Sequence, residues 1–190
     1  GSSYPINKLA LNTSLTPMLA ASLRMFILFS CLAPFCKFRI PSKKYQLPLA
    51  GFSLSMGFGV FIFLNLSLQK ATVIAPIIIG AQLAIPFAIL ASSIFLGEKV
   101  TFKMWLLIFI SFFGIFLIGY DPNLKSEIFA IVLCAVSAFF YGIANVFSRY
   151  IKNIDVKLTN AMMGFIGFVT LLFFSIIFEG NTFSQLKNID

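Results

Sequence analysis

Long apolar runs with almost no charge dominate this sequence and restrict what it can fold into. A helix rises about 1.5 Å per residue, so roughly 20 residues cross the ~30 Å hydrocarbon core of a bilayer. Six runs reach this length, and a seventh is partial: 16–36, 47–69, 73–96, 104–120, 128–148, 159–178 and the partial run 1–13. No run alternates like a barrel strand, and only helices and closed barrels satisfy the backbone in lipid. The sequence therefore predicts an all-α, polytopic membrane protein.

The charges of the connecting segments indicate how the runs are oriented. The chain is 59% hydrophobic and only 11% charged, with a net charge of +8. The segments around Lys37–Lys44, Lys99–Lys103 and Arg149–Lys157 hold nine basic residues, and the alternate segments hold three: Lys70, Lys125 and Lys187. The positive-inside rule places the nine-residue side in the cytoplasm. The positive charge is therefore a feature of topology, and we expect no nucleic-acid partner.

The sequence lacks the residues that several classes of function need. The sequence contains no histidine, and Cys31, Cys36 and Cys134 have no paired spacing, so neither a metal site nor a disulfide framework is visible. A membrane-embedded enzyme would need a nucleophile with a base, or paired carboxylates, at one depth. A receptor or scaffold would leave the polar residues inside the runs unexplained. We therefore expect no enzymatic activity, no cofactor and no ATP drive, because no nucleotide-binding motif is present.

A short internal repeat points to a transporter. Aligning Gly1 with Gly142 places Lys8 on Arg149, and "LTPMLAA" (Leu15–Ala21) then meets "LTNAMMG" (Leu158–Gly164) after a two-residue insertion. The period covers five spans, and an odd number of spans inverts the second copy in the membrane. Inverted repeats are typical of secondary transporters, whose substrate sites lie near the midplane at the repeat interface.

Three stretches of the chain carry the motifs of a known family. They are "GSSYPINKLAL" followed by "LTPMLAASLRMFI", then "AQLAIPFAILASSIFLGEKVTFKMWLLIFISFFGIFLIG", and then "AVSAFFYGIANVFSRYI". An Ala-x-x-Arg second helix and a Gly-Glu-x-hydrophobic-Thr end to the fourth helix resemble the EamA-type drug/metabolite transporters. Within that family the chain is most similar to exporters of amino-acid metabolites.

The resemblance implies a fold and a function. The fold is an inverted-repeat helical bundle of the ten-span type, with about seven spans in this chain. Residues 1–120 would form the first five-helix repeat, its first helix truncated, and 128–190 the start of the second. The function is secondary transport of small polar metabolites by alternating access, with export of amino acids or their derivatives favoured. Uptake or exchange of nucleotide-like metabolites such as S-adenosylmethionine is the alternative.

The expected partners are the lipid bilayer and a small-molecule substrate. A proton or a counter-solute as coupling partner is left open, as is the oligomeric state. We expect an integral, multi-pass protein of the bacterial inner (cytoplasmic) membrane.

Polar residues inside the runs are the candidates for the substrate pathway. A zwitterionic solute needs neutral donors and acceptors around a water-filled cavity, and a cation can hold its carboxylate. We predict that six residues line the pathway: Tyr4, Lys8, Asn65, Gln82, Tyr141 and Asn145. For Gln82 and Asn145, interhelical hydrogen bonds are the alternative interpretation.

Four further residues are predicted to have structural or gating roles. Arg24 lies about 12 Å into its span by helix rise, where its charge needs carbonyls, water or a group from further spans. Glu98 lies at the cytoplasmic end of the fourth span, just before Lys99. We predict that it fixes the cytoplasmic gate through ion pairs, with a role in proton coupling as the alternative. Pro76 and Pro86 each remove a backbone hydrogen bond, so we predict that both kink the fourth helix beside Gln82.

Overall fold

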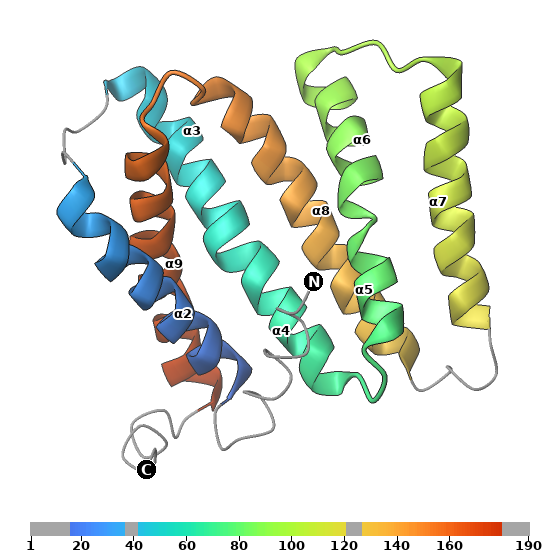
Figure 1. The fold of residues 1–190 in the computed structure, drawn as a ribbon, viewed down its shortest axis with the longest axis horizontal. Coiled ribbons are helices and arrows are strands. Elements are labelled where there is room, and N and C mark those ends of the chain that lie inside the picture. The colour runs from blue at the N-terminus through green and yellow to red at the C-terminus, as the bar shows by residue number, and fades with distance from the viewer. Residues whose placement is uncertain (1–15, 37–41, 121–126, 180–190) are drawn as a thin grey trace.

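The computed structural model describes residues 16–36, 42–120 and 127–179, which form a bundle of helices (Figure 1). Within these ranges five helical segments are long and apolar enough to cross a membrane: Met18–Phe35, Lys43–Lys70, Ala75–Leu96, Ile128–Tyr150 and Val156–Glu179. A sixth apolar helix, Phe102–Ile118, is shorter. The predicted all-α, polytopic fold is confirmed. The partial run 1–13 lies outside the described residues.

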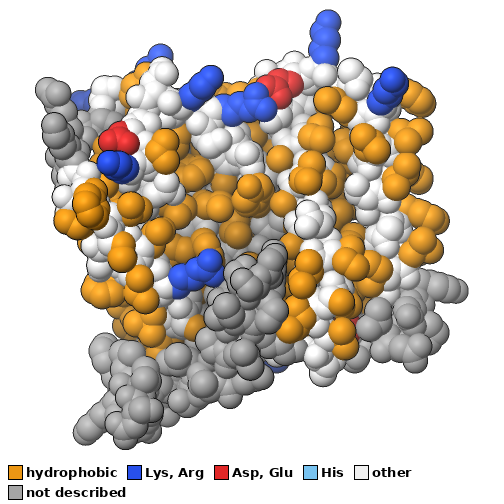
Figure 2. All heavy atoms as spheres, viewed as in Figure 1, with side chains coloured by type: hydrophobic (Ala, Val, Ile, Leu, Met, Phe, Trp, Pro, Cys, Tyr) orange, Lys and Arg blue, Asp and Glu red, His pale blue; other side chains and the backbone are white. Residues whose placement is uncertain are grey.

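Basic segments meet at one end of the bundle. The start of α3 (Lys43–Ser53), the connection between α6 (Ala84–Leu96) and α7 (Phe102–Tyr120), and the connection between α8 (Ile128–Tyr150) and α9 (Val156–Glu179) lie at the top of Figure 1. In Figure 2 most of the charged side chains follow this upper edge, and hydrophobic side chains cover the helices below it. We refer to this end as the basic face and to the other end as the opposite face. The location of the basic face in the cytoplasm remains a prediction.

Helices α2 (Pro17–Leu32) and α9 (Val156–Glu179) pack side by side and run in opposite directions (Figure 1). Met25 and Leu171 lie in the buried cluster between these helices and α4. A Cβ atom added at Gly164 of α9 would lie 3.1 Å from the backbone nitrogen of Phe29, so the two backbones are close. These are the two helices that the internal repeat equates, although the repeat itself stays a prediction.

The third span changes its helical geometry in the middle. It consists of α3 (Lys43–Ser53), a π-helical segment η2 (Leu54–Val60) and α4 (Phe61–Lys70). A Cβ atom at Gly57 would lie 2.8 Å from the carbonyl oxygen of Met163 in α9, and one at Gly59 would lie 2.5 Å from the ring of Phe140 in α8. The π-helical segment therefore lies where glycines of the third span pack closely against α8 and α9.

The fourth span is broken into α5 (Ala75–Ala81) and α6 (Ala84–Leu96). Pro76 stands in the first turn of α5, where a missing N–H leaves no bond unmade, so the prediction that it kinks the helix is wrong. Pro86 follows the break and cannot donate to the carbonyl of Gln82, which instead accepts from the backbone nitrogen of Ile85 at 3.2 Å. Of the two prolines, only Pro86 is placed to interrupt the helix.

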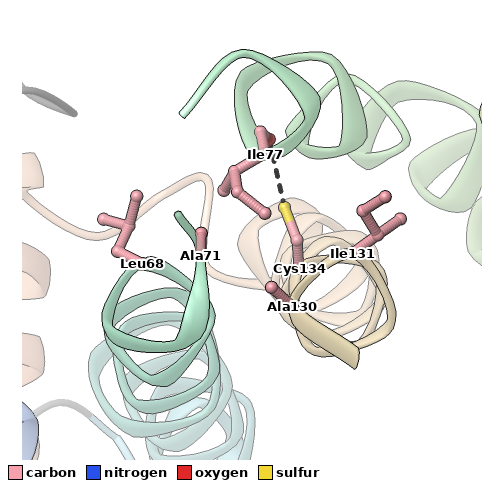
Figure 3. Close-up of a cluster of buried hydrophobic side chains, with 6 residues drawn as sticks. All are labelled: Leu68, Ala71, Ile77, Ala130, Ile131 and Cys134. Atoms are coloured by element: carbon pink, nitrogen blue, oxygen red, sulfur yellow. Dashed lines mark hydrogen bonds between the residues drawn. The ribbon is translucent and has the colours of Figure 1, made fainter. Parts of the chain in front are cut away.

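Helix α8 (Ile128–Tyr150) lies at the centre and packs against α3, η2, α4, α5 and α6. Its end at the opposite face contributes Ala130, Ile131 and Cys134 to a buried cluster with residues of α4 and α5 (Figure 3). The Cys134 thiol donates a hydrogen bond to the carbonyl oxygen of Ile77 at 3.3 Å. Helix α7 (Phe102–Tyr120) lies at the edge, beside α5 and α6.

Candidate substrate pathway

The break in the fourth span lies between two cavities. One, of about 230 Å³, is lined by η2, α4, α8 and the break, and we call it the midspan cavity. The other, of about 280 Å³, lies between the break and α7. Gln82, an exposed side chain at the break itself, lines both of them. The interruption of the helix therefore places a neutral donor and acceptor between a cavity beside α8 and a cavity beside α7.

A larger cavity opens toward the basic face, and we call it the charged vestibule. Its volume is about 420 Å³, and it lies between α6, the α6–α7 connection, the start of α7 and α8. Its polar lining consists of Ser92, Glu98, Lys99, Tyr141, Asn145 and Arg149. Tyr141 and Ala84 line both the vestibule and the midspan cavity, so the two spaces adjoin at these residues.

One face of α8 supplies the polar groups of both cavities. Ser137 and Tyr141 line the midspan cavity, and Tyr141, Asn145 and Arg149 line the vestibule. Spacings of three and four residues place these side chains on one side of a helix. The Ser137 hydroxyl donates to the carbonyl oxygen of Val60 in η2 at 2.9 Å. The result is a polar stripe from the middle of the bundle to its basic face.

The side-chain amide of Asn145 bonds within its own helix. Its Nδ2 atom donates to the carbonyl oxygen of Tyr141 at 3.2 Å. Among the described residues this bond lies within α8, whereas the alternative interpretation of Asn145 expects a bond to another helix. Because the amide nitrogen is held in this way, the amide group is oriented at the vestibule wall with its oxygen as the remaining acceptor.

An ion pair at the mouth of the vestibule joins two spans. Arg149 Nη1 donates to Glu98 Oε1 at 2.5 Å, and the two side chains are 56% and 45% exposed. Glu98 follows Gly97, whose left-handed backbone (φ 67°) ends α6. From the sequence, Arg149 is identified as one of the basic residues that set the topology and as the repeat counterpart of Lys8, but not as a pathway residue. Its spacing from Tyr141 and Asn145 on α8 was the signal that could have identified it as a lining residue.

The other predicted site residues lie apart from these cavities. Asn65 is 5% exposed on α4 and lines none of the three cavities. Tyr4 and Lys8 lie outside the described residues. The Arg24 guanidinium carbon lies 4.9 Å from the centroid of the Phe61 ring in α4, a cation–π distance. An aromatic ring thus provides a compensation for the Arg24 charge that sequence reasoning did not consider.

Two carboxylates at the opposite face were missed by sequence reasoning. Glu127, only 1% exposed before α8, accepts the Thr72 amide N–H at 2.9 Å and 3.1 Å and also the Thr72 hydroxyl. Glu179, at the end of α9, accepts the amide N–H of Met18 at 3.1 Å and the hydroxyls of Ser175 and Thr16. Each carboxylate therefore fastens a helix end of the first four spans to α8 or α9. Their positions directly beside apolar runs were the only signal in the sequence.

Long apolar helices in a multi-pass bundle define an integral membrane protein. The chain matches the EamA-like transporter family over residues 1–120 of its 190 residues, and it belongs to that family. No curated protein and no solved structure matches the chain. Membership places the protein among membrane transporters of small molecules, in contact with the lipid bilayer, and not among enzymes.

Proposed function

We propose that this protein is a secondary transporter that moves small polar metabolites by alternating access, and that amino acids or their derivatives are exported by it. The bacterial inner membrane is the proposed location. The observation that carries the proposal is the pair of adjoining cavities beside the broken fourth span, in a chain of the EamA-like transporter family. Discontinuous helices near the midplane are where secondary transporters bind their substrates.

The lining of these cavities suits a polar but uncharged or zwitterionic solute. Gln82, Tyr141 and Asn145 contribute an amide, a phenol and an amide, and alanine and isoleucine side chains of α6 contribute apolar wall. Neutral polar groups of this kind fix orientation, and apolar walls supply contact area. Tyr4, Lys8 and Asn65 stay in the proposal as pathway residues on the sequence argument alone.

The two ends of the bundle differ in a way that fits alternating access. At the basic face the vestibule is bordered by an exposed ion pair between Glu98 and Arg149. At the opposite face the buried carboxylate of Glu127 and that of Glu179 hold helix ends together through hydrogen bonds. We interpret this arrangement as a conformation open toward the basic face, with Glu98 and Arg24 among the residues that control opening.

Flux measurements on the full-length protein in liposomes test this proposal. A panel of radiolabelled amino acids should be transported, and S-adenosylmethionine and nucleotides should not. Flux of the nucleotide-like solutes alone would replace the proposed substrate class, and absence of flux for every solute would reject secondary transport of these metabolites.

Alanine variants test the cavity assignment in the same assay. Gln82→Ala and Tyr141→Ala should reduce flux while membrane insertion stays normal. Gln69→Ala and Tyr150→Ala are matched controls, because Gln69 and Tyr150 are exposed side chains that line none of the three cavities. Equal flux in all four variants would remove Gln82 and Tyr141 from the pathway.

A further inference from the structure

The mouth of the charged vestibule carries charges of both signs. Glu98 and Lys99 follow the end of α6, and Arg149 lies in the last turn of α8. All three line the same cavity of about 420 Å³, which is within the range of about 300–1,000 Å³ found for small-molecule pockets. The single carboxylate can attract the ammonium group of a ligand. The two basic groups give the mouth an excess of positive charge, which can attract an anionic group.

The ion pair at this mouth can exchange partners at little cost. Its side chains are 56% and 45% exposed, and exposed ion pairs contribute little to stability because water and salt screen them. Burial of the pair would add a desolvation cost for both charges. Exposure beside a cavity instead leaves both groups accessible to a charged solute.

Both partners also keep bonding capacity. In the described part of the chain, the pair joins one guanidinium nitrogen of Arg149 to one carboxylate oxygen of Glu98. A guanidinium has five N–H donors and a carboxylate has two oxygens with about four acceptor positions. Arg149 can therefore donate hydrogen bonds to a second carboxylate, in the planar geometry that guanidinium groups favour, while Glu98 binds an ammonium group.

The two adjacent charges of opposite sign favour a class of ligand. An α-amino acid carries its ammonium and its carboxylate on one carbon atom, so its two charges can lie alongside those of the directly paired Glu98 and Arg149. Beyond the pair, Tyr141, Asn145 and Ser92 provide neutral polar groups, and Ile85, Ile89 and Met104 provide apolar wall for a side chain. A multiply charged phosphate would be attracted by Lys99 and Arg149 but repelled by Glu98, so it suits the mouth less well than a zwitterion.

We propose that Glu98 and Arg149 form the recognition site for the zwitterionic head group of an apolar α-amino acid. Arg149 binds the carboxylate, Glu98 binds the ammonium group, and the side chain lies against the wall of α6. This inference rests on the proposed transport function and deepens it, since it assigns to two charged residues the selection of the substrate at the basic face.

Equilibrium binding to the purified full-length protein tests the assignment with three matched ligands. They are L-leucine, L-leucinamide, which has no carboxylate, and N-acetyl-L-leucine, which has no ammonium group. Calorimetry should show that the wild-type protein prefers leucine to each analogue by about tenfold or more, as expected for charge-assisted hydrogen bonds. Arg149→Gln should abolish the preference over leucinamide only, and Glu98→Gln should abolish the preference over N-acetyl-leucine only.

The pattern across variants separates recognition from a structural role. If the ion pair is only structural, both variants should lower the affinity for all three ligands in equal proportion. That result would overturn the assignment. So would wild-type protein that fails to bind leucine or binds the three ligands equally. Lys152→Gln, which removes an exposed basic residue of the same face that does not line the vestibule, should change no ratio. If the wild-type protein transports amino acids but the binding preferences of Arg149→Gln and Glu98→Gln match those of the wild type, only this site is rejected. Absence of all flux would reject the transport proposal.

Discussion

Replacing Gly142 with alanine should destabilise the bundle, although the same change usually stabilises a helix. A Cβ atom at Gly142 would lie 2.8 Å from both the carbonyl carbon and the carbonyl oxygen of Phe87 and 3.1 Å from the backbone nitrogen of Ala88. These are backbone atoms of α6, which cannot turn aside as the end of a flexible side chain can. To accommodate one methyl group, α8 and α6 must therefore separate along their contact.

The magnitude follows from two opposing effects. Alanine gains about 0.5–1 kcal/mol over glycine in a helix interior. Overpacking a close contact costs typically 1–3 kcal/mol. The difference lies between about 0 and 2.5 kcal/mol and centres on a net loss of about 1 kcal/mol, which for a chain of this size corresponds to a fall in Tm of roughly 2–4 °C. Because Gly142 adjoins Tyr141 at the junction of the two cavities, flux should fall as well.

Thermal unfolding of the purified protein in detergent measures this change. Gly114→Ala in α7 is the matched control, because a Cβ atom at Gly114 would meet nothing within 4 Å. The control should keep or raise the Tm, by the helix-propensity gain alone. If Gly142→Ala were as stable as Gly114→Ala, the close contact of α8 with α6, and the cavities built on it, would be refuted.

Three further substitutions have expected outcomes. Glu127→Ala should cost about 1.5–3 kcal/mol, because hydrogen bonds to a buried carboxylate are lost, and an unchanged Tm would contradict the buried geometry. Pro86→Ala should lower flux without lowering Tm, since it restores an N–H that can close the helix across the break, whereas Pro76→Ala at the start of α5 should leave flux intact. Phe61→Leu should cost about 0.5–1 kcal/mol more in the wild-type protein than in an Arg24→Gln background, because its packing cost is common to both and only the cation–π contact differs. A double-mutant cycle on Tm measures this difference, and equal costs in both backgrounds would exclude the contact.

Apolar run length was sufficient to predict the spans, because the bilayer imposes that length on any helix that crosses it. The fourth span shows where this signal ends. Hydropathy is continuous across Gln82, and two prolines flank it, yet only Pro86 interrupts the helix. A proline in the first turn of a helix and a proline in its interior look alike in sequence until the start of the helix is known. Ile74, the residue before α5, has no capping side chain that would mark this start.

Contacts between spans could not be predicted from the sequence for a different reason. The Glu98–Arg149 bond joins residues 51 positions apart, and it exists because α6 packs on α8, which charge counting cannot reveal. The π-helical segment at Leu54–Val60 has the same origin, since close approach to α8 and α9 accompanies it and no residue type demands it. Glu127 reads as a loop acid beside an apolar run, and only the position of Thr72 shows that it is buried.

The chemistry of the two faces differs, and the difference bears on the mechanism. At the opposite face, Glu127 and Glu179 bind backbone amides and hydroxyls, neutral groups whose bonds salt does not screen effectively where they are buried. At the basic face, Glu98 and Arg149 form a bond that water and ions already compete for. A solute with its own carboxylate and ammonium can replace the second kind of bond but has no comparable means of replacing the first. The basic face is therefore the end of the bundle where a substrate can itself change the contacts that hold the spans together.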